Sequence, residues 1–213
     1  MYLEAAPGER LLDVGCGSGE LMARMQDLGW RVEGVDFDAM AVQAARESGL
    51  KVRLGTLEEQ PYPDGHFEAI TMSHVIEHVH EPLALLSECH RILEPGGRII
   101  VVTPNIRSLC HRRFRTDWRG LEPPRHLQVM APSALLCLAQ GAGFQNFSIW
   151  TSMQSADFMY VASTFIKRTG VHSEDEAASR FERLRGRLMQ HQEWAMLKVR
   201  ADVGEEIVAV LEK

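Results

Sequence analysis

A glycine-rich turn follows a short apolar stretch near the start of the 213-residue chain, in the segment LLDVGCGSGE. Its glycines are Gly15, Gly17 and Gly19. Glycine adopts positive φ angles and lets a ligand lie against bare backbone, and the helix expected next presents unpaired N–H groups. A dinucleotide-binding turn reads G-x-G-x-x-G, and Glu20 stands where its third glycine would be. The turn therefore indicates a nucleoside site and points away from a dinucleotide.

An acidic residue, Asp36, ends the second predicted strand. In folds that bind dinucleotides, an acid at this place accepts hydrogen bonds from ribose hydroxyls. The alternative is a tight turn followed by an ordinary exposed aspartate. Because the turn and the acid occur together in the expected order, we interpret them as two parts of one nucleoside site.

Histidines and an acid gather just after the fourth predicted strand, in SHVIEHVH. An imidazole of near-neutral pKa can act as a general base toward a hydroxyl. The candidate catalytic residues are His78, with Glu77 next to it, and His126, which lies later in the chain in the segment PPRHL. The alternative for His78 is a side chain that only bonds backbone at the start of a helix.

The same histidines raise the question of a metal. His74, Glu77, His78 and His126 would offer nitrogen and oxygen ligands to a divalent ion. We expect no metal, and keep these four residues as the ligand set that a bound ion would use.

Several arginines, with two aromatic residues among them, follow the fifth predicted strand. They are Arg107, Arg112, Arg113, Phe114, Arg115, Trp118 and Arg119. Guanidinium groups bind carboxylate and phosphate, and aromatic rings offer stacking surfaces. We predict that residues 104–131 form an irregular active-site loop that selects an anionic or aromatic small molecule. The alternative is a solvated basic loop.

The elements that must position these residues alternate regularly. Apolar stretches expected as strands are separated by amphipathic stretches expected as helices, which is the pattern of a parallel sheet covered on both faces. The predicted strands are residues 10–14, 31–35, 51–54, 67–72, 98–102, 144–151 and 204–213. Ligands of such folds bind beyond the carboxyl ends of the strands, where the turn, Asp36 and the histidines would lie.

Two helices are predicted before the last strand, over residues 155–168 and 174–199. The predicted buried face of the second consists of Ala177, Phe181, Leu184 and Leu188. We therefore predict one domain over residues 1–213, with a helical insertion over residues 155–200.

Composition limits the classes of protein to consider. A net charge of -6 and a hydrophobic content of 45% are ordinary for a globular protein, so no nucleic-acid partner is expected. The four cysteines form no C-x-x-C pair, which fits a reducing compartment. No apolar run approaches the roughly 20 residues that span a bilayer, and the N-terminus has no signal pattern. We expect a cytoplasmic monomer or homodimer.

Four segments occur in the order typical of class I S-adenosylmethionine-dependent methyltransferases. They are LLDVGCGSG, VEGVDFD, PYPDGHFEAITMSHVIEHV and RILEPGGRIIVVTPN. Over residues 9–150 the chain resembles this superfamily, and IEHV and PPRHL resemble its branch of ubiquinone-biosynthesis-type O-methyltransferases. The resemblance implies an α/β fold with a doubly wound, Rossmann-like, mostly parallel sheet of seven strands, the last of them antiparallel, and helices on both faces.

The resemblance also implies a cofactor, S-adenosyl-L-methionine, which leaves as S-adenosyl-L-homocysteine. The cofactor-binding residues that it implies are Asp13, Gly15, Gly17, Gly19, Asp36, Phe37, Leu57 and Ser73. The chain departs from the family at Thr56, where many members carry an aspartate for the adenine amino group.

The resemblance also implies a role for several of these residues. The glycine turn would pack against the methionine and ribose moieties, with Asp13 beneath it. Asp36 would take the ribose hydroxyls, and Phe37 would flank the adenine. Leu57 would bond the adenine through its backbone, and Ser73 would hold the methionine amino group.

Together these features predict a methyltransferase that methylates a hydroxyl of a small-molecule acceptor. Two alternatives stay open. A nucleic-acid methyltransferase would hold phosphates with the arginines, and its binding would weaken steeply with salt. A cofactor-binding protein without catalysis would bind the cofactor without turnover.

Overall fold

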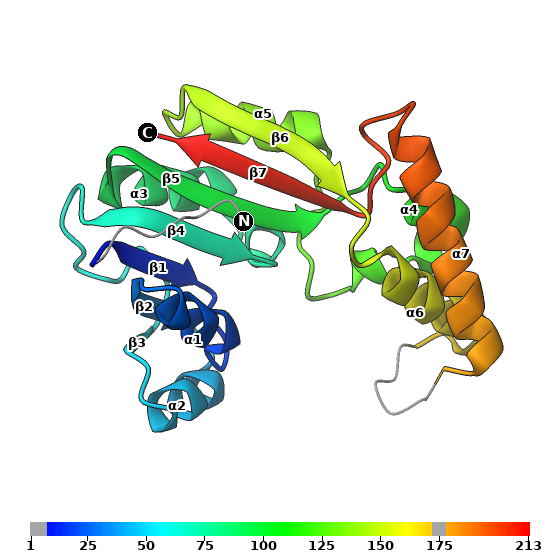
Figure 1. The fold of residues 1–213 in the computed structure, drawn as a ribbon, viewed down its shortest axis with the longest axis horizontal. Coiled ribbons are helices and arrows are strands. Elements are labelled where there is room, and N and C mark those ends of the chain that lie inside the picture. Colours follow the sequence, from blue (N-terminus) through cyan, green and yellow to red (C-terminus); the bar gives the residue numbers. More distant parts are fainter. Residues whose placement is uncertain (1–7, 172–177) are drawn as a thin grey trace. The chain divides into compact units, whose positions relative to one another are not determined.

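The computed structural model describes residues 8–171 and 178–213. Its contacts divide the chain into two compact units (Figure 1). The first contains the chain up to Val102, residues 136–148 and residues 209–213, and the second contains residues 103–135 and 149–208. The prediction of one domain over residues 1–213 stays a prediction.

The seven strands form one sheet in the order β3-β2-β1-β4-β5-β7-β6. The strands are β1 (Arg10–Val14), β2 (Arg31–Asp36), β3 (Val52–Leu54), β4 (Phe67–Ser73), β5 (Leu93–Pro104), β6 (Asn146–Ser152) and β7 (Glu206–Glu212). The pairs from β3 to β5 are parallel. Gly96 N donates to Lys213 O, and Lys213 N donates back to Gly97 O, so β7 runs antiparallel to β5. The predicted Rossmann-like fold class is confirmed.

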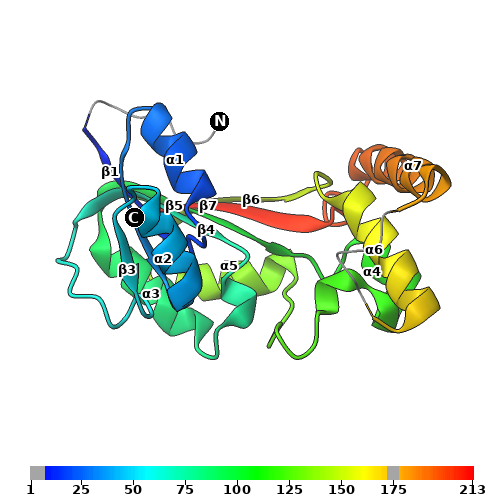
Figure 2. The same ribbon diagram turned by 90° about the horizontal axis from the view of Figure 1, so that it is seen from below.

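Among the described residues, four α-helices belong wholly or mostly to the first unit. They are α1 (Glu20–Asp27), α2 (Ala39–Glu47), α3 (Pro82–Ile92) and most of α5 (Pro132–Gly141). Asp38 Oδ1 accepts a hydrogen bond of 2.8 Å from Met40 N and so caps α2. Figure 2 shows α3 and α5 together on the side of the sheet away from α1. The sheet is therefore covered on both faces.

The first unit's core joins its first helices to its first strands. Met22 of α1 and Val42 of α2 pack in one cluster with Leu11, Val32 and Val52 of the strands. This packing fixes the strand ends from which the glycine turn and Asp36 emerge. Among the described residues, none of the helices is both long and apolar enough to cross a membrane.

The second unit contains regular structure where an irregular loop was predicted. Within residues 104–131, α4 (Leu109–Phe114) is followed by two 3-10 turns, η2 (Arg115–Asp117) and η3 (Arg119–Leu121). Ser108 caps α4 by accepting from His111 N. The expectation of an irregular segment was wrong because Cys110, Phe114 and Trp118 bury themselves in the unit's core, which the local pattern did not reveal.

The second unit also contains α6 (Ala156–Thr169) and α7 (Arg180–Leu197), close to the predicted helices. The predicted buried face of α7 was wrong: Phe181, Leu184 and Leu188 are 60%, 55% and 60% exposed. The buried residues of α7 are Gly186, Met189 and Glu193. Ala177 lies outside the described residues.

The reason for the rotated face of α7 lies in α6. A Cβ placed on Gly186 would come within 2.7 Å of Asp157 O, so the absence of a side chain at Gly186 allows α7 to approach α6 closely there. An apolar pattern alone favoured the opposite face, because the true one includes the buried acid Glu193. Contact with α6 therefore decides which face is buried.

Two acids are buried together in the second unit. Glu205 N donates to Glu193 Oε1 over 2.8 Å, and Trp118 Nε1 donates to Glu205 Oε1 over 2.5 Å. Burial raises the pKa of Glu193 to about 8, with the charge of Glu205 adding to the effect. Burial likewise raises the pKa of Glu205 to about 7, although Trp118 opposes the shift. Both carboxyls therefore hold a proton in the folded chain at pH values where the unfolded chain has lost it.

We expect the free energy of unfolding to fall as pH rises through this range. The stabilisation from a raised acid pKa is complete below the unfolded pKa of 4.5 and is lost by about pH 8. Glu193→Gln keeps an acceptor for Glu205 N but cannot ionise, so it should recover on the order of 2 kcal/mol at pH 8 relative to pH 5. Urea unfolding at both pH values measures this. Glu212→Gln, at an exposed position, is the control, and parallel curves for Glu193→Gln and wild type would contradict the expectation.

Candidate functional site

The glycine turn links β1 to α1 in a left-handed backbone conformation. Gly15 and Gly17 have φ angles of 71° and 53°. Gly15 N donates to Val35 O over 2.8 Å, which ties the turn to β2. A Cβ on Gly15 would lie 2.2 Å from Val75 Cγ2, whereas a Cβ on Gly17 would meet nothing within 4 Å. The turn is therefore packed against protein at Gly15 and open at Gly17.

Asp36 connects this turn to the end of β2. Its Oδ2 accepts from Gly17 N and its Oδ1 accepts from Asp38 N, both over 2.8 Å. The residue is buried, with 8% of its surface exposed. A carboxylate offers about four lone-pair sites, so each oxygen keeps room for a further donor. Such a held carboxylate can accept two neighbouring hydroxyls.

Apolar side chains are exposed next to Asp36. Phe37 is 76% exposed and Met40 is 82% exposed, although most large apolar residues of the first unit are buried. An exposed aromatic ring can stack on a planar base. The sequence reasoning named Phe37 but missed Met40, whose position in the first turn of α2 was the available signal.

The segment after β3 supplies backbone to the same strand edge. Gly55 N donates to Asp36 O over 2.9 Å. The side chain of Leu57 is buried, and its carbonyl accepts from Gln60 N over 3.0 Å, so the backbone N–H is the group that Leu57 would offer a ligand. Thr56 N donates to Glu59 Oε2 over 2.8 Å.

Asp13 lies beneath the turn. It is buried in β1, and Thr71 Oγ1 donates to its Oδ1 over 2.7 Å. Burial raises the pKa of Asp13 to about 7, and the charge of Asp36 adds to this, while the Thr71 bond opposes it. Asp13 therefore joins β1 to β4 at the base of the turn. Thr71, one strand away, was missed because nothing in the local sequence pairs it with Asp13.

The end of β4 carries the histidine segment. Ser73 is the exposed last residue of β4, and it pairs with Val102 of β5. His74 has a φ angle of 55°, a region that a residue with a side chain rarely adopts, and its N donates to Val102 O over 2.9 Å. Non-glycine residues in this region cluster at functional sites. The positive φ of His74 therefore marks this end of β4 as a candidate functional position.

A short turn, η1 (Ile76–His78), follows His74. Glu77 is completely buried, and its Oε1 lies 3.2 Å from His74 Nδ1. His78 is partly exposed, and its N donates to Val75 O over 2.9 Å. The structure thus brings His74 and Glu77 into contact within the first unit.

His126 belongs to the second unit. Its side chain is nearly buried, and its Nδ1 lies 2.7 Å from Gly120 O. A carbonyl oxygen only accepts, so Nδ1 carries a hydrogen. Nε2 faces Glu122 Oε2 at 3.5 Å. Glu122 was not named from the sequence. The metal hypothesis, which needs His126 together with the residues after β4, stays a hypothesis.

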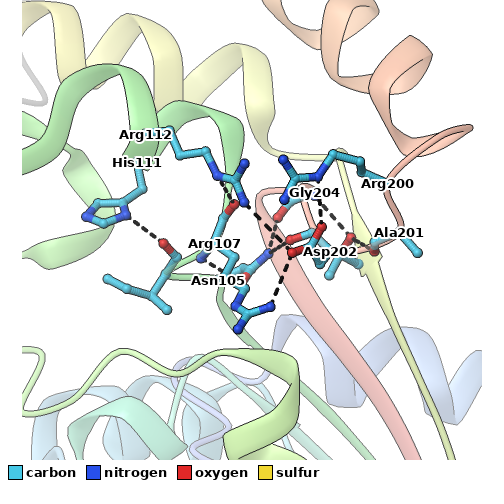
Figure 3. A network of polar contacts seen from close by, with 10 residues as sticks. Asn105, Arg107, His111, Arg112, Arg200, Ala201, Asp202 and Gly204 are labelled. Atoms are coloured by element: carbon cyan, nitrogen blue, oxygen red, sulfur yellow. Dashed lines mark hydrogen bonds and ion pairs between the residues drawn. The ribbon is translucent and has the colours of Figure 1, made fainter.

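The arginines of the predicted loop have different neighbours. Arg119 pairs with Glu122 through a short ion pair, and the guanidinium of Arg113 lies over the Tyr160 ring at 5.6 Å. Arg107 and Arg112 instead approach Asp202, from the turn before β7 (Figure 3). The basic segment is therefore divided among separate contacts.

Comparison with known proteins identifies the family. Residues 2–149 match the family model described as a methyltransferase domain. The chain belongs to this family of S-adenosylmethionine-dependent methyltransferases. The resemblance stated from the four ordered segments is thereby confirmed.

The methyltransferase is similar to two bacterial proteins named ubiquinone biosynthesis O-methyltransferase. It is 40% identical to that of Xanthomonas campestris over 111 residues, which are 47% of this chain and 45% of that protein. It is 31% identical to that of Xylella fastidiosa over 208 residues, 92% of this chain and 71% of that protein. The methyltransferase thus spans less than half of the Xanthomonas relative.

A solved structure has the same fold. A SAM-dependent methyltransferase from Archaeoglobus fulgidus superposes with a TM-score of 0.69 at 20% identity, covering 100% of this chain and 88% of that one. The family's cofactor is S-adenosylmethionine, and the methyltransferase fits it on its own geometry. A held carboxylate, an open glycine turn and an exposed aromatic ring lie together at the strand ends.

Proposed function

We propose that the chain transfers the methyl group of S-adenosylmethionine to a hydroxyl of a small-molecule acceptor. The main support for cofactor binding is the Asp36 carboxylate, which accepts a hydrogen bond from Gly17 N and lies beside the exposed Phe37. Support for O-methylation comes from the two relatives whose names state it. A cytoplasmic location and a monomeric or homodimeric state remain part of this proposal.

Each part of the cofactor has a proposed partner. Asp36 accepts the ribose hydroxyls, Phe37 stacks on the adenine, and Leu57 N–H bonds to the ring. Ser73 holds the methionine amino group. Asp13 acts from beneath, since its bond to Thr71 fixes the strand from which the turn leaves.

The glycines act through their backbone. Gly15 and Gly17 lie against the methionine and ribose moieties, and Gly19 lets the chain enter α1 with a φ angle of 87°. A side chain at Gly17 would project into open space, which is the space that we assign to the ligand.

The bound cofactor supplies an electrophilic methyl group on a sulfonium. Transfer of this methyl group to the acceptor oxygen would release the hydroxyl proton, which a base of the protein would take. We assign His78 and His126 as the candidate bases. In His126 the bond from Nδ1 to Gly120 O leaves Nε2 as the nitrogen that would take the proton. Glu77, through its contact with His74, holds the segment that carries His78.

Release of S-adenosylhomocysteine from labelled cofactor with a panel of phenols, catechols and hydroxy acids tests the proposal. We expect turnover with a hydroxyl acceptor, and His78→Gln or His126→Gln to lower kcat by roughly a hundredfold, the usual effect of losing a general base. His80→Gln, an exposed change in the same segment as His78, should leave kcat unchanged.

Other outcomes would point elsewhere. Cofactor binding without turnover on any acceptor would favour a binding protein. Methylation of RNA or DNA, with affinity falling steeply as salt increases, would favour a nucleic-acid methyltransferase. Equal turnover by wild type and both histidine variants would remove the histidines from the mechanism.

A further inference from the structure

Three arginines converge on one carboxylate in the second unit (Figure 3). Arg107 Nη1 and Arg112 Nη2 lie 3.4 and 3.8 Å from Asp202 Oδ2. Arg200 Nε lies 3.5 Å from Asp202 Oδ1. Arg107 comes from the segment after β5, Arg112 from α4, and Arg200 from the turn between α7 and β7. Segments far apart in the sequence thus place their positive charges together.

A buried amide holds this arrangement in place. Asn105 is completely buried, and its Nδ2 donates to Asp202 O over 2.9 Å and to Gly204 O over 2.7 Å. Its Oδ1 accepts from Arg107 N over 2.9 Å. Arg112 Nε in turn donates to Arg107 O over 3.1 Å. The backbone that carries the cluster is therefore fixed before any ligand arrives.

The cluster has more positive charge than Asp202 can balance. Charge-assisted hydrogen bonds between guanidinium and carboxylate are typically about 2.7–2.9 Å long, and all three contacts here are longer. The arginine side chains are 54%, 39% and 45% exposed, so solvent reaches them. Burial opposes ionisation of Asp202, but Arg200, Arg107 and Arg112 together lower its pKa, so it stays charged. Three cations around one anion leave an excess of two positive charges.

We propose that Arg107, Arg112 and Arg200 bind a doubly charged oxyanion, the phosphate monoester group of a small molecule. A guanidinium fork matches two phosphate oxygens, and a phosphate monoester carries close to two negative charges at neutral pH. The excess charge of the cluster equals that of the ligand. The site lies wholly within the second unit, and its binding does not depend on methyl transfer.

Calorimetric titration of the protein with methyl phosphate at low ionic strength tests the proposed phosphate site. We expect saturable binding, and methyl sulfate, a tetrahedral monoanion of the same shape, should bind far more weakly. Arg112→Gln and Arg200→Gln should each weaken methyl phosphate binding by roughly tenfold. Asp202→Asn should strengthen it several-fold, because it removes the competing charge while keeping the side-chain shape.

Arg187→Gln on α7 is the matched control, since it removes one exposed charge elsewhere in the same unit. It should leave the affinity unchanged. Circular dichroism and thermal unfolding verify that each variant is folded. No saturable binding to wild type, equal binding of methyl sulfate, an equal loss in Arg187→Gln, or no gain in folded Asp202→Asn would each overturn the proposal.

Discussion

Replacing Asp36 by alanine should weaken the binding of S-adenosylhomocysteine by about a thousandfold. The proposed role of Asp36 is to accept two ribose hydroxyls, and hydrogen bonds to a charged group contribute about 1.5–3 kcal/mol each. Two such bonds correspond to roughly a hundredfold to ten-thousandfold in affinity. The change also removes the acceptor for Gly17 N, which holds the turn against β2. Calorimetric titration of folded protein measures the loss.

Two further variants make this result specific. Asp36→Asn keeps the side-chain shape and one acceptor oxygen, so it should fall between wild type and Asp36→Ala. Asp64→Asn removes an exposed acid in the same unit and should bind like wild type. If Asp36→Ala were folded and bound S-adenosylhomocysteine as tightly as Asp64→Asn, the ribose role of Asp36 would be wrong.

Gly15→Ala and Gly17→Ala should both lower the free energy of unfolding, but by different amounts. At Gly15 the new methyl would lie 2.2 Å from Val75 Cγ2, with φ in the left-handed region. Overpacking costs about 1–3 kcal/mol and an unfavourable φ about 1–2 more, so we expect Gly15→Ala to lose about 3 kcal/mol of unfolding free energy. At Gly17 only the φ cost applies, about 1 kcal/mol, because the methyl meets no protein atom.

The affinity for S-adenosylhomocysteine should also be affected by the change at Gly17. The methyl of Gly17→Ala enters the space assigned to the ligand, so this stable variant should bind S-adenosylhomocysteine poorly. Urea unfolding and calorimetry on the same samples measure both quantities. Gly29→Ala, at another positive φ with no atom nearby, controls for backbone strain and should bind normally. Normal binding by Gly17→Ala would contradict the proposed position of the cofactor.

Much of the first unit was predictable because its signals are local. The Gly15–Gly19 turn and the predicted strand positions each depend on residues within a few positions of one another. Parallel strands joined by helices then bring their carboxyl ends to one edge. The prediction that Asp36 and the turn meet follows from this topology, and the bond from Gly17 N to Asp36 agrees with it.

The second unit was predicted less well because its outcomes depend on partners distant in sequence. The helix α4 forms where no period was visible, and α7 buries the face that contains Gly186 and Glu193. Amphipathic periodicity shows that a helix has two faces, but the partner helix decides which one is covered. Here the close approach of Asp157 O to Gly186 decides it.

The sequence by itself determined the fold class, the family and the strand edge at which we propose that the cofactor binds, because these follow from order, spacing and strand periodicity. Only the tertiary structure decided which charges meet. Arg107, Arg112 and Arg200 all contact Asp202, whose backbone the buried Asn105 amide holds. Thr71 of β4 donates to Asp13 of the neighbouring strand β1. Electrostatic contacts act over a few ångströms in space, whatever the separation along the chain, so no local pattern could reveal them.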